Sequence, residues 1–121
     1  MTVHYPEFTQ LTESIDESGR RHLRAQFAVT PDCLYLQGHF PEAPLLPGVT
    51  QLDWAIQLAA DHWQTPRTVR TIEVLKFNDM ILPKAEVTLT LEWKRDDCVV
   101  FRYQHNDTAY SSGRLIFNSA D

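Results

Sequence analysis

The segment from Gly48 to about Trp63 constrains the fold more than any other part of the chain. Apolar residues recur there at helical spacing, and further apolar residues fill much of the remaining circumference. The first set is Val49, Leu52, Ile56, Ala59, Ala60 and Trp63, and the second is Trp54, Ala55 and Leu58. A helix that is apolar nearly all round is usually buried. With Pro66 ending the segment, the pattern predicts one long buried helix.

The rest of the chain carries strand patterns. Residues 85–93 alternate between apolar and polar side chains, which is the period of a half-buried strand. The predicted strands cover residues 7–15, 23–29, 68–77, 85–93, 98–104 and 109–118, and a loop over about 31–47 holds a short strand at 33–36. The order is strands, one helix and then about four consecutive antiparallel strands. This predicts an α+β fold in which a curved sheet wraps a central helix.

Length and composition limit the function classes. The 121 residues, without repeat or linker, predict a single domain spanning 1–121. No apolar run reaches the roughly 20 residues that span a bilayer, and the N-terminal sequence lacks a secretory-signal pattern, so we expect a cytoplasmic protein with no membrane span. The net charge of −5 argues against nucleic-acid binding. Cys33 and Cys98 are expected to be free thiols in the core.

Two features of the predicted helix point to chemistry. Pro47 and Gly48 place a residue without a side chain where the first N–H groups of the helix point outward, and such an end can bind an anion or a developing oxyanion. The alternative, which a lone Pro-Gly pair favours, is that these residues only begin the helix. Asp53 lies among apolar neighbours, and a buried carboxyl would keep its proton and serve as a general acid. The alternative is an exposed Asp53 on a polar stripe with Gln57 and Asp61, which periodicity alone favours.

His39 is the candidate base, because it follows Gly38 in a loop constrained by prolines and imidazole is the usual base near neutral pH. The other histidines are interpreted as structural. These are His4, His22, His62 and His105.

These residues carry a family resemblance. The segment "GHFPEAPLLPGV", with Asp53 fourteen positions after His39 and Gln57 four further on, resembles the β-hydroxyacyl-acyl-carrier-protein dehydratases of the FabA/FabZ type. Downstream, "LKFNDMILP" is similar to the family's strand that begins Lys-Phe. The short length of the chain and its segment "LLPGVTQLDWA" resemble the small, ApeI-like dehydratases of aryl polyene biosynthesis.

The resemblance implies a hot-dog fold, a homodimer with active sites at the subunit interface, and no cofactor or metal. It implies that His39 is the base, that Asp53 of the other subunit is the acid, and that Gln57 supports the acid. The Gly48 N–H, next to Val49, would hold the thioester carbonyl. The implied activity is dehydration of a 3-hydroxyacyl thioester carried on acyl carrier protein.

Further residues are assigned as hypotheses. Leu45, Trp54 and Phe77 are candidates for a substrate tunnel, although the aromatic residues are equally typical of a core. Arg67, Arg70 and Lys76 are candidates for docking the acidic carrier protein. Asn78 and Asp79 stand where the family often has basic residues, which bears on that docking. The alternatives are a hot-dog thioesterase and a catalytically silent interaction domain.

Overall fold

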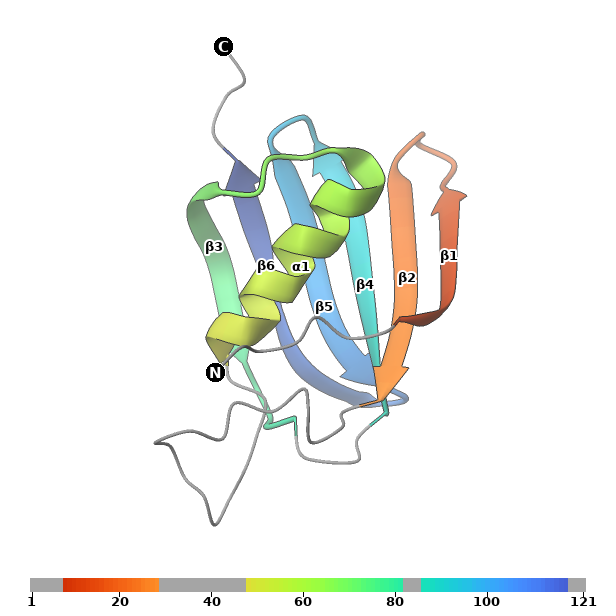
Figure 1. Ribbon diagram of the computed structural model, residues 1–121, viewed down its shortest axis with the longest axis vertical. Coiled ribbons are helices and arrows are strands. Elements are labelled where there is room, and N and C mark those ends of the chain that lie inside the picture. Colours follow the sequence, from red (N-terminus) through yellow and green to blue (C-terminus); the bar gives the residue numbers. More distant parts are fainter. Residues whose placement is uncertain (1–7, 29–47, 82–85, 118–121) are drawn as a thin grey trace.

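The computed structural model describes residues 8–28, 48–81 and 86–117. These residues form six strands and one helix (Figure 1). The elements are β1 (Thr9–Ile15), β2 (Arg21–Ala28), α1 (Gly48–Trp63), β3 (Val69–Phe77), β4 (Glu86–Arg95), β5 (Cys98–His105) and β6 (Thr108–Phe117). The predicted helix and all six main predicted strands are confirmed. The predicted short strand at 33–36 lies outside the described residues.

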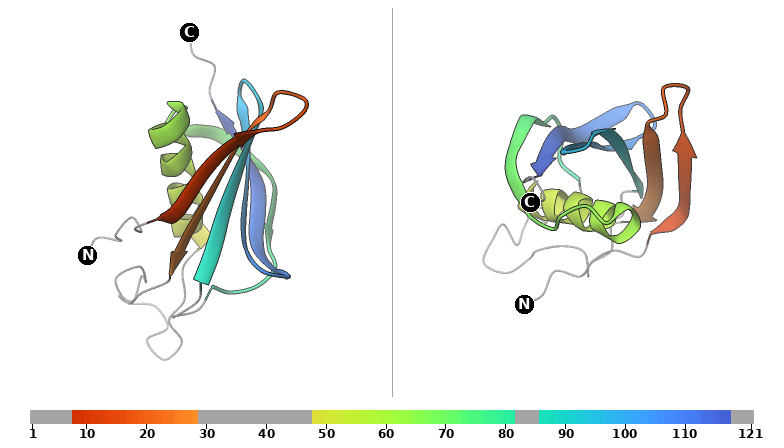
Figure 2. Two further views of the ribbon diagram at one scale, coloured as in Figure 1. Left: turned by 90° about the vertical axis from the view of Figure 1, so that its right-hand side faces the viewer. Right: turned by 90° about the horizontal axis from the view of Figure 1, so that it is seen from above.

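The strands form one antiparallel sheet in the order β1-β2-β4-β5-β6-β3. Strands β4, β5 and β6 follow one another through tight turns, whereas β3 pairs with β6 at the far side of the sheet. The predicted order of four consecutive antiparallel strands after the helix is confirmed, and the sheet places β3 beside β6 rather than beside β4. Figure 2 shows the sheet curving around α1, which lies in its concave face. This is the hot-dog arrangement.

The core lies between the concave face and the helix. Alternate residues of the central strands point inward, as their sequence period requires. The largest fully buried side chains are Trp54, Tyr103, Phe101, Phe117, Leu23, Leu58, Ile81, Leu89, Leu91, Leu115 and Ile116. Cys98 is a buried free thiol, as predicted, and burial raises its pKa. Cys33 lies outside the described residues.

One face of α1 differs from the prediction of burial all round. Its buried face includes Trp54, Ala55 and Leu58, whereas Val49 is 73% exposed and Leu52 is partly exposed. The reason is geometric, since a single curved sheet contacts a helix from one side. Within the described residues, no helix combines the length and apolar character needed to cross a membrane.

Candidate active site

The N-terminal end of α1 is packed closely against β3. Gly48 is the first helical residue, and a Cβ atom built there would lie 2.7 Å from Cζ of the Phe77 ring. A larger residue at position 48 would therefore displace this ring. The first N–H groups of a helix have no acceptor within the helix and carry partial positive charge. The close approach of the Phe77 ring thus favours a residue without a side chain at the helix end suited to binding an oxyanion.

Asp53 stands on the outward side of the same helix. Gln57 Nε2 donates a hydrogen bond of 2.6 Å to Asp53 Oδ2. Val49, Asp53, Gln57 and Asp61 follow one another at intervals of four residues and form one outward line. Asp53 is exposed, which confirms the alternative of a polar stripe for the single chain. The prediction that apolar neighbours in the helix bury this carboxyl is wrong. The described residues therefore leave this carboxyl exposed.

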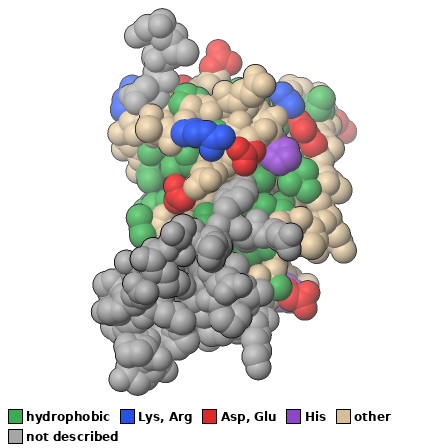
Figure 3. Space-filling model, viewed as in Figure 1, with side chains coloured by type: hydrophobic (Ala, Val, Ile, Leu, Met, Phe, Trp, Pro, Cys, Tyr) green, Lys and Arg blue, Asp and Glu red, His purple; other side chains and the backbone are tan. Residues whose placement is uncertain are grey.

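Exposed apolar side chains lie on β3 and just after it, and one of them, Phe77, contacts the start of the helix. Val74, Leu75, Phe77 and Met80 of β3 and the residues after it are 39–58% exposed. Figure 3 shows hydrophobic side chains on the helix side of the molecule. Strand β3 also stands at one end of the strand order, so its outer edge pairs with no described strand. An apolar surface beside an open sheet edge is typical of an interface.

The backbone of β3 is irregular at the same place. Its pairing with β6 shifts register between Glu73 and Lys76, and Val74 has a φ of 52°. Positive φ is strained for a β-branched residue. Bulges of this kind occur at sheet edges and next to active sites, where they redirect side chains.

The remaining predicted site residues are distributed as follows. His39 and Leu45 lie outside the described residues. Trp54 is 1% exposed, and its ring stands edge-on to Phe27 with centroids 5.6 Å apart, so it belongs to the core in this chain. Phe77 is 49% exposed and covers Gly48.

The predicted docking residues differ in their charge partners. Arg67 Nη2 lies 2.8 Å from Asp61 Oδ1, which partly neutralises it. Arg70 and Lys76 are exposed on β3 and form no ion pair with another described residue. Arg70 and Lys76 therefore remain the stronger cations for an acidic partner.

A buried polar group behind the first turns of α1 was not predicted. The Tyr103 hydroxyl donates to the Gln51 carbonyl oxygen at 2.7 Å, and the Ser111 hydroxyl donates to Gln51 Oε1 at 2.6 Å. All three residues are buried. The available signal was Gln51 itself, a polar residue one turn before Ala55 on the apolar face of the predicted helix.

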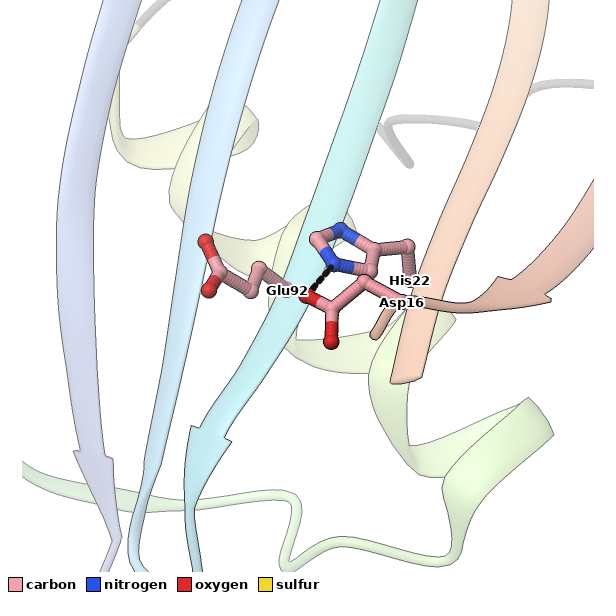
Figure 4. Close-up of side chains that lie close together, drawn as sticks. All are labelled: Asp16, His22 and Glu92. Carbon is pink, nitrogen blue, oxygen red and sulfur yellow. Dashed lines mark hydrogen bonds and ion pairs between the residues drawn. The ribbon is translucent and has the colours of Figure 1, made fainter. Parts of the chain in front are cut away.

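A second polar cluster lies on the convex face, where Asp16, His22 and Glu92 could each offer one metal ligand (Figure 4). These atoms already have protein partners. His22 Nε2 lies 2.8 Å from Asp16 Oδ2, and Arg20 Nη1 lies 3.0 Å from Glu92 Oε2. The His22 hydrogen bond, together with those from the Ser18 hydroxyl and the Ser18 and Arg20 backbone N–H groups, holds the pKa of Asp16 well below its usual range. We interpret these interactions as ones that stabilise the turn between β1 and β2.

Comparisons with known proteins agree with this architecture. The model of the ApeI-like family, described as ApeI dehydratase, matches residues 14–114. An uncharacterised protein from Erwinia carotovora subsp. atroseptica has 32% identity and a TM-score of 0.77, covering 92% of this chain and 94% of its own. The dehydratase heterocomplex ApeI:P from Xenorhabdus doucetiae has 27% identity and a TM-score of 0.72, with coverages of 92% and 96%.

A more distant structure shares the fold alone. The putative thioesterase yhdA from Lactococcus lactis has 12% identity and a TM-score of 0.57, with coverages of 93% and 94%. At this identity the likeness carries no information on the reaction. The chain therefore resembles dehydratases in sequence and structure, and a thioesterase in architecture.

Proposed function

The chain belongs to the ApeI-like dehydratase family, and from that premise we propose that it removes water from a 3-hydroxyacyl thioester carried on acyl carrier protein, giving the trans-2-enoyl thioester. The observation that carries the proposal is the arrangement on α1. A helix N-terminus that begins at a glycine packed against Phe77 and an outward carboxyl at Asp53, held by Gln57, lie within two turns of one helix. This pairs an oxyanion donor with an acid.

Each group has a defined part in the proposed reaction. His39 removes the proton from C2, and the N–H of Gly48 stabilises the enolate-like charge on the thioester oxygen. The electron pair of the broken C2–H bond forms the C2–C3 double bond. Protonated Asp53 donates its proton to the C3 hydroxyl, which leaves as water. Gln57 holds the Asp53 carboxyl in position.

A second hot-dog chain completes the site in this proposal. Asp53 and Val49 are exposed on α1, Phe77 is exposed where it contacts the start of that helix, and the outer edge of β3 pairs with no described strand. A partner chain there would cover the apolar surface and exclude water from Asp53, which favours a neutral carboxyl. We propose a homodimer. Since the relative from Xenorhabdus doucetiae is a heterocomplex, a different hot-dog chain is the competing partner.

The reaction is tested by following two products from the same substrate. Purified protein is given carrier-bound 3-hydroxyacyl thioesters, and the conjugated enoyl product and the free thiol are measured together. A dehydratase forms the enoyl thioester without releasing thiol. Release of thiol would instead identify a thioesterase, and absence of both products across the panel would favour a silent interaction domain. Comparing aryl-capped polyenyl chains with aliphatic chains tests the proposed role in aryl polyene biosynthesis.

The shared site is tested by mixing inactive variants. His39→Ala and Asp53→Asn proteins are unfolded and refolded together, so that about half of the dimers are mixed. Each mixed dimer contains one intact site and one doubly broken site, so activity should recover to roughly a quarter of wild type. A silent mixture with heterodimers confirmed by mass spectrometry would contradict a shared site. A chain that remains monomeric would instead point to a different partner.

Carrier-protein docking is proposed at Arg70 and Lys76, with Arg67 contributing less because Asp61 pairs with it. Reversal of the charges at Arg70 and Lys76 should raise the KM for carrier-bound substrate and leave that for a short soluble thioester unchanged. Lys94→Glu, at the far end of β4, is the matched control. Equal effects on both substrates would argue against docking.

A further inference from the structure

One row of residues across the concave sheet meets the first turns of α1. Phe77 of β3 is the register partner of Ser111 of β6, which is in turn the partner of Tyr103 of β5. All three side chains contact the start of the helix. Phe77 lies against Gly48, while Ser111 and Tyr103 each donate a hydrogen bond to Gln51. Three adjacent strands thus contact the same short segment of helix.

The contacts hold the helix in two different ways. Tyr103 binds the main chain of Gln51 at 2.7 Å, which fixes the depth of the helix over the sheet. Ser111 binds the side chain of the same residue at 2.6 Å, which fixes the rotation of the helix about its axis. Because Gln51 lies between Gly48 and Asp53, both the helix N-terminus and the outward carboxyl follow its position.

Packing alone does not require these polar groups. Burial of hydroxyl and amide groups is unfavourable unless every group is bonded, so apolar side chains would fill the same core more simply. A carbonyl inside a helix already accepts one bond from the N–H four residues on, and the Tyr103 hydroxyl uses its second lone pair. What the hydroxyls add is direction, since apolar contacts allow a helix to slide and hydrogen bonds do not.

We propose that Tyr103 and Ser111 are positioning residues, which act through Gln51 to place the Gly48 N–H and the Asp53 carboxyl toward the substrate. The proposal rests on the proposed dehydration. A displacement of about 1 Å in a catalytic group can lower a rate by as much as about a hundredfold. Loss of one positioning bond should therefore lower kcat while substrate binding changes little.

The test uses variants that remove one hydroxyl and keep the shape. Tyr103→Phe and Ser111→Ala should each lower kcat roughly tenfold, with KM within about twofold of wild type. The chain offers matched controls on β6, namely Tyr110→Phe and Ser112→Ala, whose positions are half-buried. The controls should keep their kcat. In the double variant of Tyr103 and Ser111 the losses should not multiply, because both hydroxyls act through one glutamine.

Backbone amide exchange provides a second readout that does not depend on the reaction. In Tyr103→Phe, the amides of the first turns of α1 should exchange faster than in wild type, and those near Trp63 should not change. A kcat within about threefold of wild type, or an equal loss in the controls, would overturn the proposal. If wild type shows no dehydration at all, the proposed function fails, and unchanged exchange in Tyr103→Phe then separately refutes the positioning role.

Discussion

The two ends of α1 are built differently. At the C-terminal end, Trp63 is 5% exposed and stacks on Trp93, with ring centroids 5.4 Å apart. The Arg21 guanidinium lies within 5.8 Å of both ring centres. Glu13 accepts hydrogen bonds from Trp63 Nε1 at 3.0 Å and from Arg21 Nε at 2.9 Å. The chain closes this end with its own side chains.

At the N-terminal end the same helix is left open on its outer side. Val49 is 73% exposed, Phe77 is 49% exposed, and the Asp53 carboxyl faces outward. The C-terminal end of α1 is therefore built mainly for stability, and the candidate site lies at its N-terminal end. Interactions at Trp63 stabilise the helix, whereas the surface at Val49 and Asp53 is available to a second chain and a substrate.

The first prediction concerns the C-terminal end of α1, which Trp63 closes. Trp63→Ala removes the stack, the ring under Arg21 and the bond to Glu13, and should lower the free energy of unfolding by about 3–5 kcal/mol. Because Gly48 is about 22 Å away along the helix at 1.5 Å per residue, the folded fraction should keep its kcat well below the melting temperature. Thermal unfolding and steady-state kinetics check this. A loss of kcat in protein that is still folded would contradict the separation of the two ends.

The second prediction concerns the N-terminal end of α1, which is open on its outer side. Asp53→Asn should lower kcat about a hundredfold or more, because the amide cannot donate a proton to the leaving hydroxyl. The melting temperature should change little, since the side chain is exposed in the chain. Asp61→Asn, on the same outward line of the helix, is the control and should keep its activity. Near-normal dehydration by Asp53→Asn would remove Asp53 from the mechanism.

Most helix and strand positions could be predicted from the sequence because they depend on local patterns of apolar and polar residues. The alternation in 85–93 and the helical repeat from Gly48 to Trp63 each report which residues face the core. The position of β3 beside β6 was not readable, because strand neighbours are set by long-range pairing that no local period encodes. The exposure of Val49 was missed for a related reason, since an exposed apolar residue on the outer side of a helix can fit the same helical period as one that faces the core.

Part of the candidate site could be predicted from the sequence. Gly48, Asp53 and Gln57 stand at one helix start, so sequence spacing brings them together. Contacts made by Gln51 depend on the register of β5 and β6, and that register is not a property of any one segment.

The third prediction sharpens the packing of the open end. Gly48→Ala adds a Cβ that would lie 2.7 Å from the Phe77 ring, so the helix start or the ring must move. We expect kcat to fall roughly tenfold by displacement of the adjacent N–H. Phe77→Leu in the same chain should recover part of this loss by opening space. Gly48→Ala with unchanged kinetics would mean that Phe77 does not fix the helix start.

The smallest expected effect tests the charge at the closed end. Hydrogen bonds from Arg21, first, and then Trp63 hold the pKa of Glu13 below its ordinary value of 4.5. A carboxyl whose folded pKa is lowered contributes stability above its unfolded pKa, and this is lost as pH falls through the folded value.

Glu13→Gln removes that contribution and keeps the Asp16 carboxyl, whose pKa is also lowered, so acid effects from Asp16 cancel when the two proteins are compared. Glu13 and Arg21 are partly exposed, so the melting temperature of the variant should be lower by only about 2 °C near pH 7. This gap should begin to close as pH falls below about 4.5, the ordinary Glu13 pKa. It should vanish once pH has passed below the folded pKa, because wild-type Glu13 is then neutral as well. Melting curves of both proteins across that range check this. A gap that stays constant or widens in acid would show that the carboxylate does not stabilise the Trp63 end.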